Sequence, residues 1–163
     1  MTAITGKIIK LGDDIDADMI LTRRQQGSSP SHQDGAPNLD EPTDGRPERV
    51  QGNEVVVAGG HFGCGPTGAQ EAAALKAAGI RCVIARSFGR GFFRQAINGG
   101  LPVVAADIVD TVSDGDHVSI DLAAGKIICG GKETTFPSYP AFVINILESG
   151  SLTAAVKKTS RKR

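Results

Sequence analysis

The sequence predicts an α/β fold with a partly parallel sheet and an antiparallel or barrel-like second half. Two patterns lead to this class. In the first half of the chain, the expected strands 54–58 and 81–86, whose central residues are apolar, enclose an alanine-rich stretch at 69–78, and such a strand–helix–strand unit forms a right-handed parallel crossover. In the second half, short apolar runs within 107–129 are separated by polar turns, which is typical of antiparallel strands.

The first part of the chain is expected to begin with a strand at 4–11, where apolar and polar residues alternate up to Gly12. The strand at 54–58 leads into a glycine-rich turn, and the helix at 69–78 follows it. We expect this helix to end at Gly79, because glycine readily adopts the left-handed backbone conformation that closes helices.

Beyond the parallel unit, the stretch 90–98 predicts a second helix, which a pair of glycines closes. A last helix is expected at 140–149, with its apolar side chains on one broad face. The remaining strands are expected at 101–105, 107–112, 117–122 and 126–129.

Two segments carry few large hydrophobic residues. Residues 25–49 contain four prolines and three glycines, and we expect a long mobile loop there, because such a segment cannot offset its ordering entropy. Basic residues near the C-terminus predict a frayed, solvated tail over about 154–163. We expect one domain over residues 1–163, since a chain of this length can bury a core.

Charge and hydropathy exclude several classes of partner. Lys and Arg together number 18, as do Asp and Glu, so no net charge attracts nucleic acid or an anionic membrane. The sequence shows no apolar run long enough to cross a membrane and no signal-peptide pattern. We therefore expect a cytoplasmic protein with neither a nucleic-acid nor a membrane partner.

The three cysteines, Cys64, Cys82 and Cys129, do not indicate a metal site within this chain. Cluster ligands usually include a closely spaced pair, and these residues are far apart in the sequence. Cys82 lies in the expected strand at 81–86, where a free cysteine acts as a small hydrophobe. Cys64 lies in the glycine turn, as either a catalytic nucleophile or a packed turn residue.

The turn itself, AGGHFGCGPTG, predicts a site for a small anion. Glycine allows tight turning and close approach of the backbone, and a helix start presents free N–H groups to a carboxylate or phosphate. His61 stands in this turn as a hydrogen-bonding scaffold or as a base. Its glycines are Gly59, Gly60, Gly63, Gly65 and Gly68.

Several motifs occur in a fixed order along the chain: GDDIDADMIL, VVAGGHFGCG, LKAAGIRCVIARSF, FFRQAINGGLP and DGDHVSIDL. With their order and spacing, from Gly6 to about Leu152, the sequence resembles the small subunits of 3-isopropylmalate dehydratase, the swivelling domain of the aconitase superfamily. The resemblance implies a three-layer β/β/α fold. It also implies a hydro-lyase that acts on a small hydroxy dicarboxylate, with no cofactor in this chain and a 4Fe–4S cluster in a separate large subunit.

The chain departs from the family where a Ser-Ser-Arg-Glu turn normally follows Gly-Cys-Gly. Here the four positions are Pro66, Thr67, Gly68 and Ala69, so the serine base and the arginine clamp are both absent. Only Thr67 retains a hydroxyl group, which makes it a catalytic candidate. Gly68 and the neighbouring Gly65 and Cys64 remain candidates for contact with the substrate.

The resemblance carries the family's active-site aspartate to Asp13. His61 stands where the family has asparagine, and the absence of the serine base makes it a further catalytic candidate. Arg24 keeps the family's arginine position, and Arg23 adds a second cation. Together these arginines could replace the missing carboxylate clamp. The other interpretation is that both are solvated loop residues.

Two functions remain open at this point. The chain is either the small subunit of a hydro-lyase that acts with a cluster-bearing large subunit on a substrate more polar than isopropylmalate, or a non-catalytic relative that binds a dicarboxylate or a partner protein. The polar Arg23-Arg24-Gln25-Gln26 segment favours the first, and the altered turn favours the second.

The substitution Arg24→Ala tests the proposed clamp. If Arg24 makes a charged hydrogen bond to a substrate carboxylate, its loss should weaken dicarboxylate binding by about 1.5–3 kcal/mol. Isothermal titration calorimetry measures this change, and an unchanged affinity would remove Arg24 from the site.

Overall fold

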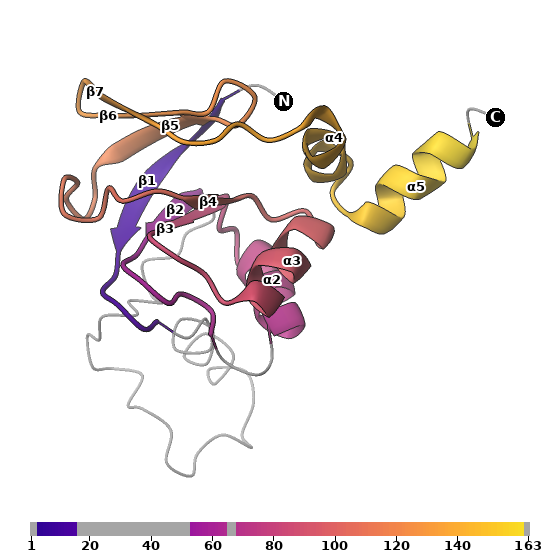
Figure 1. The fold of residues 1–163 in the computed structure, drawn as a ribbon, viewed down its shortest axis with the longest axis horizontal. Coiled ribbons are helices and arrows are strands. Elements are labelled where there is room, and N and C mark those ends of the chain that lie inside the picture. The colour runs from indigo at the N-terminus through magenta and orange to yellow at the C-terminus, as the bar shows by residue number, and fades with distance from the viewer. Residues whose placement is uncertain (1–2, 16–52, 65–67, 162–163) are drawn as a thin grey trace, which may run out of the picture.

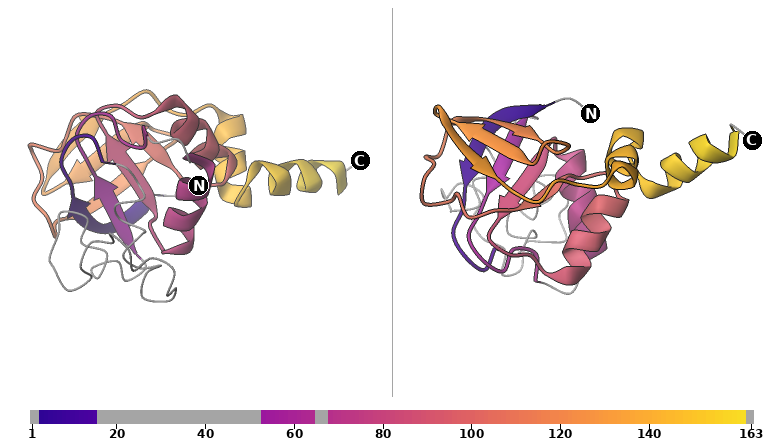
Figure 2. Two further views of the ribbon diagram at one scale, coloured as in Figure 1. Left: turned by 90° about the horizontal axis from the view of Figure 1, so that it is seen from below. Right: turned by 45° about the horizontal axis from the view of Figure 1, so that its top comes forward.

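The computed structural model describes residues 3–15, 53–64 and 68–161 (Figure 1). Seven strands form one mixed sheet in the order β4-β3-β2-β1-β5-β6-β7, which curves into a half-barrel with helices beside it (Figure 2). This confirms the predicted α/β class. The strands are β1 (Ile4–Lys10), β2 (Glu54–Val57), β3 (Cys82–Ala85), β4 (Val103–Ala105), β5 (His117–Asp121), β6 (Lys126–Cys129) and β7 (Lys132–Thr135). The helices are α2 (Gly68–Ala77), α3 (Arg90–Asn98), α4 (Ala141–Ser149) and α5 (Leu152–Arg161).

Strands β1 to β4 form the parallel half of the sheet. β2 pairs with β1 on one side and with β3 on the other, and β4 continues beyond β3. Both crossovers run in the same direction along the sheet, so right-handed connections place α2 and α3 on one face, where the two helices contact each other. Every residue of β2 and β3 is buried, which explains why these segments are apolar apart from Glu54 at the start of β2.

Strands β5 to β7 form the antiparallel half, and β5 pairs with β1 to join the halves. Figure 1 shows this half at the top, the parallel strands below it, and α2 and α3 below and to the right, which are the three expected layers. Gly130 and Gly131 connect β6 to β7 with φ of 58° and 79°. Positive φ at both positions is what a two-residue hairpin turn needs.

Three parts of the chain differ from the sequence prediction. The prediction of a strand at 107–112 is wrong, because this segment forms a turn in which the Thr111 N–H donates to the Ile108 carbonyl at 2.9 Å. Its apolar residues Ile108, Val109 and Val112 are buried, so they reflect core packing and not strand pairing. Strand β7 was not predicted, because its sequence, KETT, is polar and mostly exposed.

The third difference is the tail. Residues Leu152–Arg161 form helix α5 where we expect a frayed segment from about residue 154. Leu152, Ala155, Val156 and Thr159 follow the helical i, i+3, i+4, i+7 spacing, so the segment has an apolar side despite its basic residues. The expected loop at 25–49 lies outside the described residues.

An aromatic cluster joins the loop after β2 to α3. The rings of Phe62 and Phe92 meet edge to face with centroids 5.3 Å apart, and Phe88 stacks on Phe92 at 6.1 Å. Gly63 lies against the same cluster with φ of 73°, and a Cβ there would come within 2.4 Å of Phe92 Cγ. The cluster therefore sets the position of the glycine loop.

The substitution Phe92→Ala should lower the free energy of unfolding by about 3–5 kcal/mol, because it removes a buried ring and leaves a cavity under the glycine loop. Urea unfolding followed by circular dichroism measures the loss. Phe142→Ala is the matched control, since Phe142 is 67% exposed, and it should cost less than about 0.5 kcal/mol. A Phe92→Ala loss below about 1 kcal/mol would show that the cluster does not support the fold.

Candidate active site

The carboxyl ends of β1, β2 and β3 meet at one edge of the sheet, where ligands of parallel α/β sheets usually bind. The loops that follow these strands, 11–15, 58–64 and 86–89, are joined by backbone hydrogen bonds. The N–H of Asp14 donates to the Gly60 carbonyl at 2.8 Å, and the N–H of Phe62 donates to the Ser87 carbonyl at 3.0 Å. The three loops thus form one continuous platform.

Close approach of one loop to another requires glycine at two points of this platform. A Cβ at position 59 would lie 1.8 Å from Asp13 Oδ1, and a Cβ at position 89 would lie 2.5 Å from the Gly63 carbonyl oxygen. The first contact packs the β1 loop on the β2 loop, and the second packs the β2 loop on the β3 loop.

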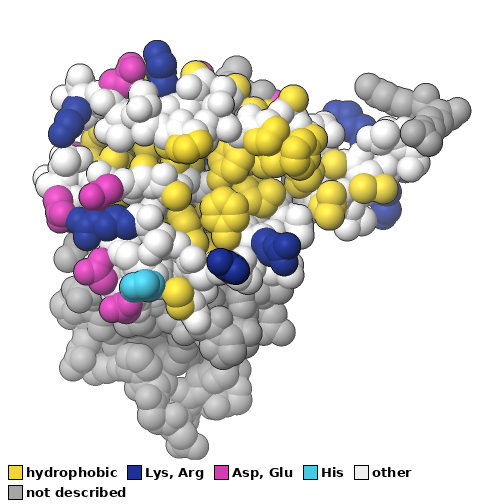
Figure 3. All heavy atoms as spheres, viewed as in Figure 1, with side chains coloured by type: hydrophobic (Ala, Val, Ile, Leu, Met, Phe, Trp, Pro, Cys, Tyr) yellow, Lys and Arg dark blue, Asp and Glu magenta, His cyan; other side chains and the backbone are white. Residues whose placement is uncertain are grey.

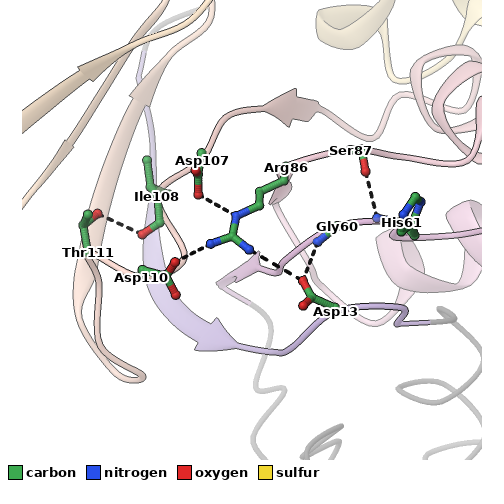
Figure 4. A network of polar contacts seen from close by, with 9 residues as sticks. All are labelled: Asp13, Gly60, His61, Arg86, Ser87, Asp107, Ile108, Asp110 and Thr111. Atoms are coloured by element: carbon green, nitrogen blue, oxygen red, sulfur yellow. Dashed lines mark hydrogen bonds and ion pairs between the residues drawn. The ribbon is translucent and has the colours of Figure 1, made fainter.

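A polar network centred on Arg86 connects the platform to the turn after β4 (Figure 4). Arg86 Nε donates to Asp107 Oδ1 at 2.6 Å, Arg86 Nη2 pairs with Asp110 Oδ2, and Arg86 Nη1 lies 3.8 Å from Asp13 Oδ1. The hydrogen bond to Asp107 raises the pKa of the Arg86 guanidinium further, and the charges of Asp110 and Asp13 act in the same direction. Arg86 is therefore a permanent cation among three carboxylates.

The structure brings two of the three predicted catalytic residues to this edge. Asp13 Oδ1 accepts the N–H of Gly60 at 2.7 Å, so the carboxylate anchors the glycine loop. His61 follows directly, with φ of 58° and its N–H donating to Ser87 Oγ at 2.8 Å. Figure 4 shows the imidazole of His61 on the far side of Gly60 from Arg86. The side chain of His61 is exposed.

The other candidates are placed only in part. Cys64 is exposed at the end of the described part of the glycine loop, and Gly68 is the first residue of α2. The third catalytic candidate, Thr67, and the substrate-binding candidates Gly65, Arg23 and Arg24 lie outside the described residues. Their roles remain predictions.

Sequence reasoning missed Arg86 and its partners Asp107 and Asp110. A signal was present for Arg86, since polar residues directly follow a buried parallel strand in ARSF. The strand expected at 107–112 includes Asp107 and Asp110, so the sequence prediction did not place them in a turn beside Arg86.

The cysteines do not fit an iron–sulfur cluster. Cys82 is fully buried in β3, as predicted, and burial raises the pKa of its thiol strongly. Cys64 is exposed and Cys129 is half-buried in β6. Among the described residues, no three His, Cys, Asp or Glu side chains gather closely enough to hold a metal ion.

A separate cavity lies away from the platform. It has a volume of about 710 Å³, is lined in part by Lys7, Arg81 and His117, and lies at the opposite edge of the parallel strands.

Within residues 3–15, 53–64 and 68–161, no helix combines the length and apolar character that a membrane span requires.

The fold and the platform define a swivelling domain of the aconitase type. The family model described as the aconitase C-terminal domain matches residues 2–107, which include β1 to β4 and the three loops of the platform.

Known proteins that cover almost all of the chain narrow this class. The 3-isopropylmalate dehydratase small subunit of Caldicellulosiruptor bescii is 38% identical over 160 residues, which is 96% of each chain. Small subunit 1 of Methanopyrus kandleri is 39% identical and covers 95% of this chain and 93% of its own. The solved 3-isopropylmalate dehydratase structure from Methanocaldococcus jannaschii superposes with a TM-score of 0.77 at 34% identity, over 99% of both chains.

The chain belongs to the family of 3-isopropylmalate dehydratase small subunits, as the motif resemblance predicts. A dehydratase is a hydro-lyase, so these relatives identify the chain as a hydro-lyase subunit. They do not favour the alternative of a non-catalytic relative.

The substitution Gly59→Ala tests the contact between the loops. The added methyl group would displace the Asp13 carboxylate from Gly60, so we expect a loss of about 1–3 kcal/mol in the free energy of unfolding and a larger loss of activity. Thermal unfolding and steady-state assays measure the two effects.

Gly60→Ala is the matched control, because a Cβ there meets its nearest atom, Ser87 Oγ, at an ordinary 3.6 Å. If both variants behaved alike, the close approach of Asp13 to Gly59 would have no part in shaping the site.

Proposed function

We propose that this chain is the small subunit of a hydro-lyase that dehydrates or isomerises a small hydroxy dicarboxylate together with an iron–sulfur large subunit. One observation carries the proposal: three loops at the carboxyl ends of β1 to β3 are joined into a platform that presents His61, Cys64 and the start of α2 at one edge. That edge suits a small anion, because the first N–H groups of a helix are free to bind one.

The platform is held in place before any ligand arrives. The carboxylate of Asp13 binds the N–H of Gly60, and Ser87 Oγ binds the N–H of His61, so the loop needs little rearrangement to meet a substrate. A site whose loops are held in this way stabilises developing charge better than a mobile one, since no reorganisation is required during the reaction.

The large subunit belongs to the proposal because this chain does not supply the cluster ligands among its described residues. The relatives are named as small subunits, which implies a second, larger chain in their enzymes. The cluster of such a partner would provide a Lewis acid, while this chain binds and orients the substrate.

The substrate we propose is more polar than isopropylmalate. The turn Pro66-Thr67-Gly68-Ala69 lacks the serine base and the arginine clamp of the family, and Arg23 and Arg24 would supply the positive charge instead. Thr67 or His61 would take over the proton transfer, with Asp13 holding the loop that carries His61.

The test is anaerobic assembly with the large subunit, followed by a spectrophotometric assay for alkene formation. The four acids assayed are isopropylmalate, citramalate, dimethylmalate and homocitrate. We expect turnover, with a higher kcat/KM for one of the other three than for isopropylmalate. A stable complex that converts none of the four would favour a binding role without catalysis.

The variants Thr67→Val and His61→Gln identify the proton-transfer group. Loss of a general base lowers kcat by about 10²–10⁴-fold, so one of the two variants should show a drop of that size. His117→Gln is the matched control, because His117 lies on β5 beside the cavity at the other edge and should leave kcat unchanged. Full activity in both variants would exclude these residues as the base.

A further inference from the structure

A band of hydrophobic side chains crosses the face of the molecule over α3 and α4 and reaches α5 (Figure 3). Two shallow grooves along α3 share Phe93 and Arg94 as lining residues, and a third groove lies between α4 and α5. We call this surface the apolar face. It consists of Phe88, Phe93, Tyr139, Phe142, Val143, Leu152 and Val156.

The groove between α4 and α5 gathers most of the exposed large hydrophobic residues of the described chain. Phe142 is 67% exposed, Val156 55% and Leu152 40%, and all three line this groove of about 400 Å³. The fourth such residue, Ile128, is 45% exposed and lies apart on β6. Exposed hydrophobic side chains that cluster in one place mark interaction surfaces.

Packing against the rest of the chain stabilises helix α5 only slightly. It extends away from the body of the molecule (Figures 1 and 2) and contacts α4 and α3, and Ala155 is its one buried residue. A helix of ten residues is marginal in water unless an apolar side is packed. The exposed apolar side of α5 therefore fits a surface that is covered in the assembled protein.

The apolar face is continuous with the candidate active site. Phe88 directly follows Ser87, whose hydroxyl binds the N–H of His61, and the backbone of Gly89 abuts Gly63 and Cys64. A partner that supplies a cluster at this edge must cover the loops, so its surface meets Phe88 and Phe93 first.

Charge distinguishes such a partner from a second copy of this chain. Arg90 and Arg94 border the groove beside Phe88, and α5 carries Lys157, Lys158 and Arg161 without a single carboxylate. Two copies that met through α5 would bring these cations together, and like charges at an interface oppose association. A partner with an apolar patch and an acidic rim avoids this cost.

We infer that the apolar face is the docking surface for the large subunit, seated on α4 and α5 as well as around the active-site loops. The inference rests on the proposed function. The contact to α5 would order that helix and fix the angle at which the platform meets the partner.

Phe142→Glu and Val156→Glu test the docking surface, and Ile128→Glu is the matched control on β6. The first two side chains are largely exposed, so the substitutions should preserve the fold, which circular dichroism and the urea midpoint verify. We expect each to raise the Kd for the purified cluster-bearing large subunit at least tenfold, while Ile128→Glu leaves the Kd within twofold.

The outcomes separate the inference from the proposed function. If the unmodified chain binds the large subunit and both α4–α5 variants bind it equally well, the docking surface is wrong and the proposed function stands. If these variants convert a homodimer of the isolated chain to monomer by light scattering without changing the Kd for the large subunit, a second copy covers the face and the inference is overturned. If the unmodified chain forms no complex, both fail.

Discussion

The carboxylate of Asp13 joins two loops that are 47 residues apart in the sequence, and the candidate site depends on this contact. It accepts the N–H of Gly60, and it fits there because Gly59 has no side chain in the way. The same carboxylate faces Arg86, which carries the connection on to the turn after β4. Asp13 Oδ1 therefore connects the loops that follow β1, β2 and β3. The loop after β2 carries His61 and Cys64, so this contact helps to set their positions.

Much of the fold can be predicted from local patterns. The parallel unit can be predicted from the sequence, because fully buried strands consist almost entirely of apolar residues and because glycine closes the helices between them. The strand expected at 107–112 shows the limit of such patterns: apolar residues there report burial, and burial does not distinguish a packed turn from a paired strand. Strand β7 shows the opposite limit, since an exposed polar strand carries no hydrophobic signal, although Gly130-Gly131 marks its hairpin.

Some residues of the candidate site can be predicted from the sequence, and others cannot. The resemblance to the family leads directly to Asp13, and His61 stands in the glycine turn that the sequence itself singles out. The pairing of Arg86 with Asp107 and Asp110 follows only from the three-dimensional arrangement, since the partners are 21 and 24 residues away and belong to another strand's loop. The altered turn at 66–69 is visible in the sequence as a departure from the family motif.

The charge of the platform constrains where a dicarboxylate can bind. Asp13, Asp107 and Asp110 surround Arg86, and their three negative charges exceed its single positive charge. These carboxylates are 63%, 70% and 77% exposed, so they repel an anion that approaches from solvent on that side. For the dianionic substrate that we propose, these charges favour a position away from the Arg86 network, toward Cys64 and the start of α2, with cationic partners supplied from elsewhere. Arg23 and Arg24 are the candidates in this chain, and the surface of the large subunit is the other source. Since the apolar face also begins beside Cys64, substrate binding and subunit docking would meet at the same place.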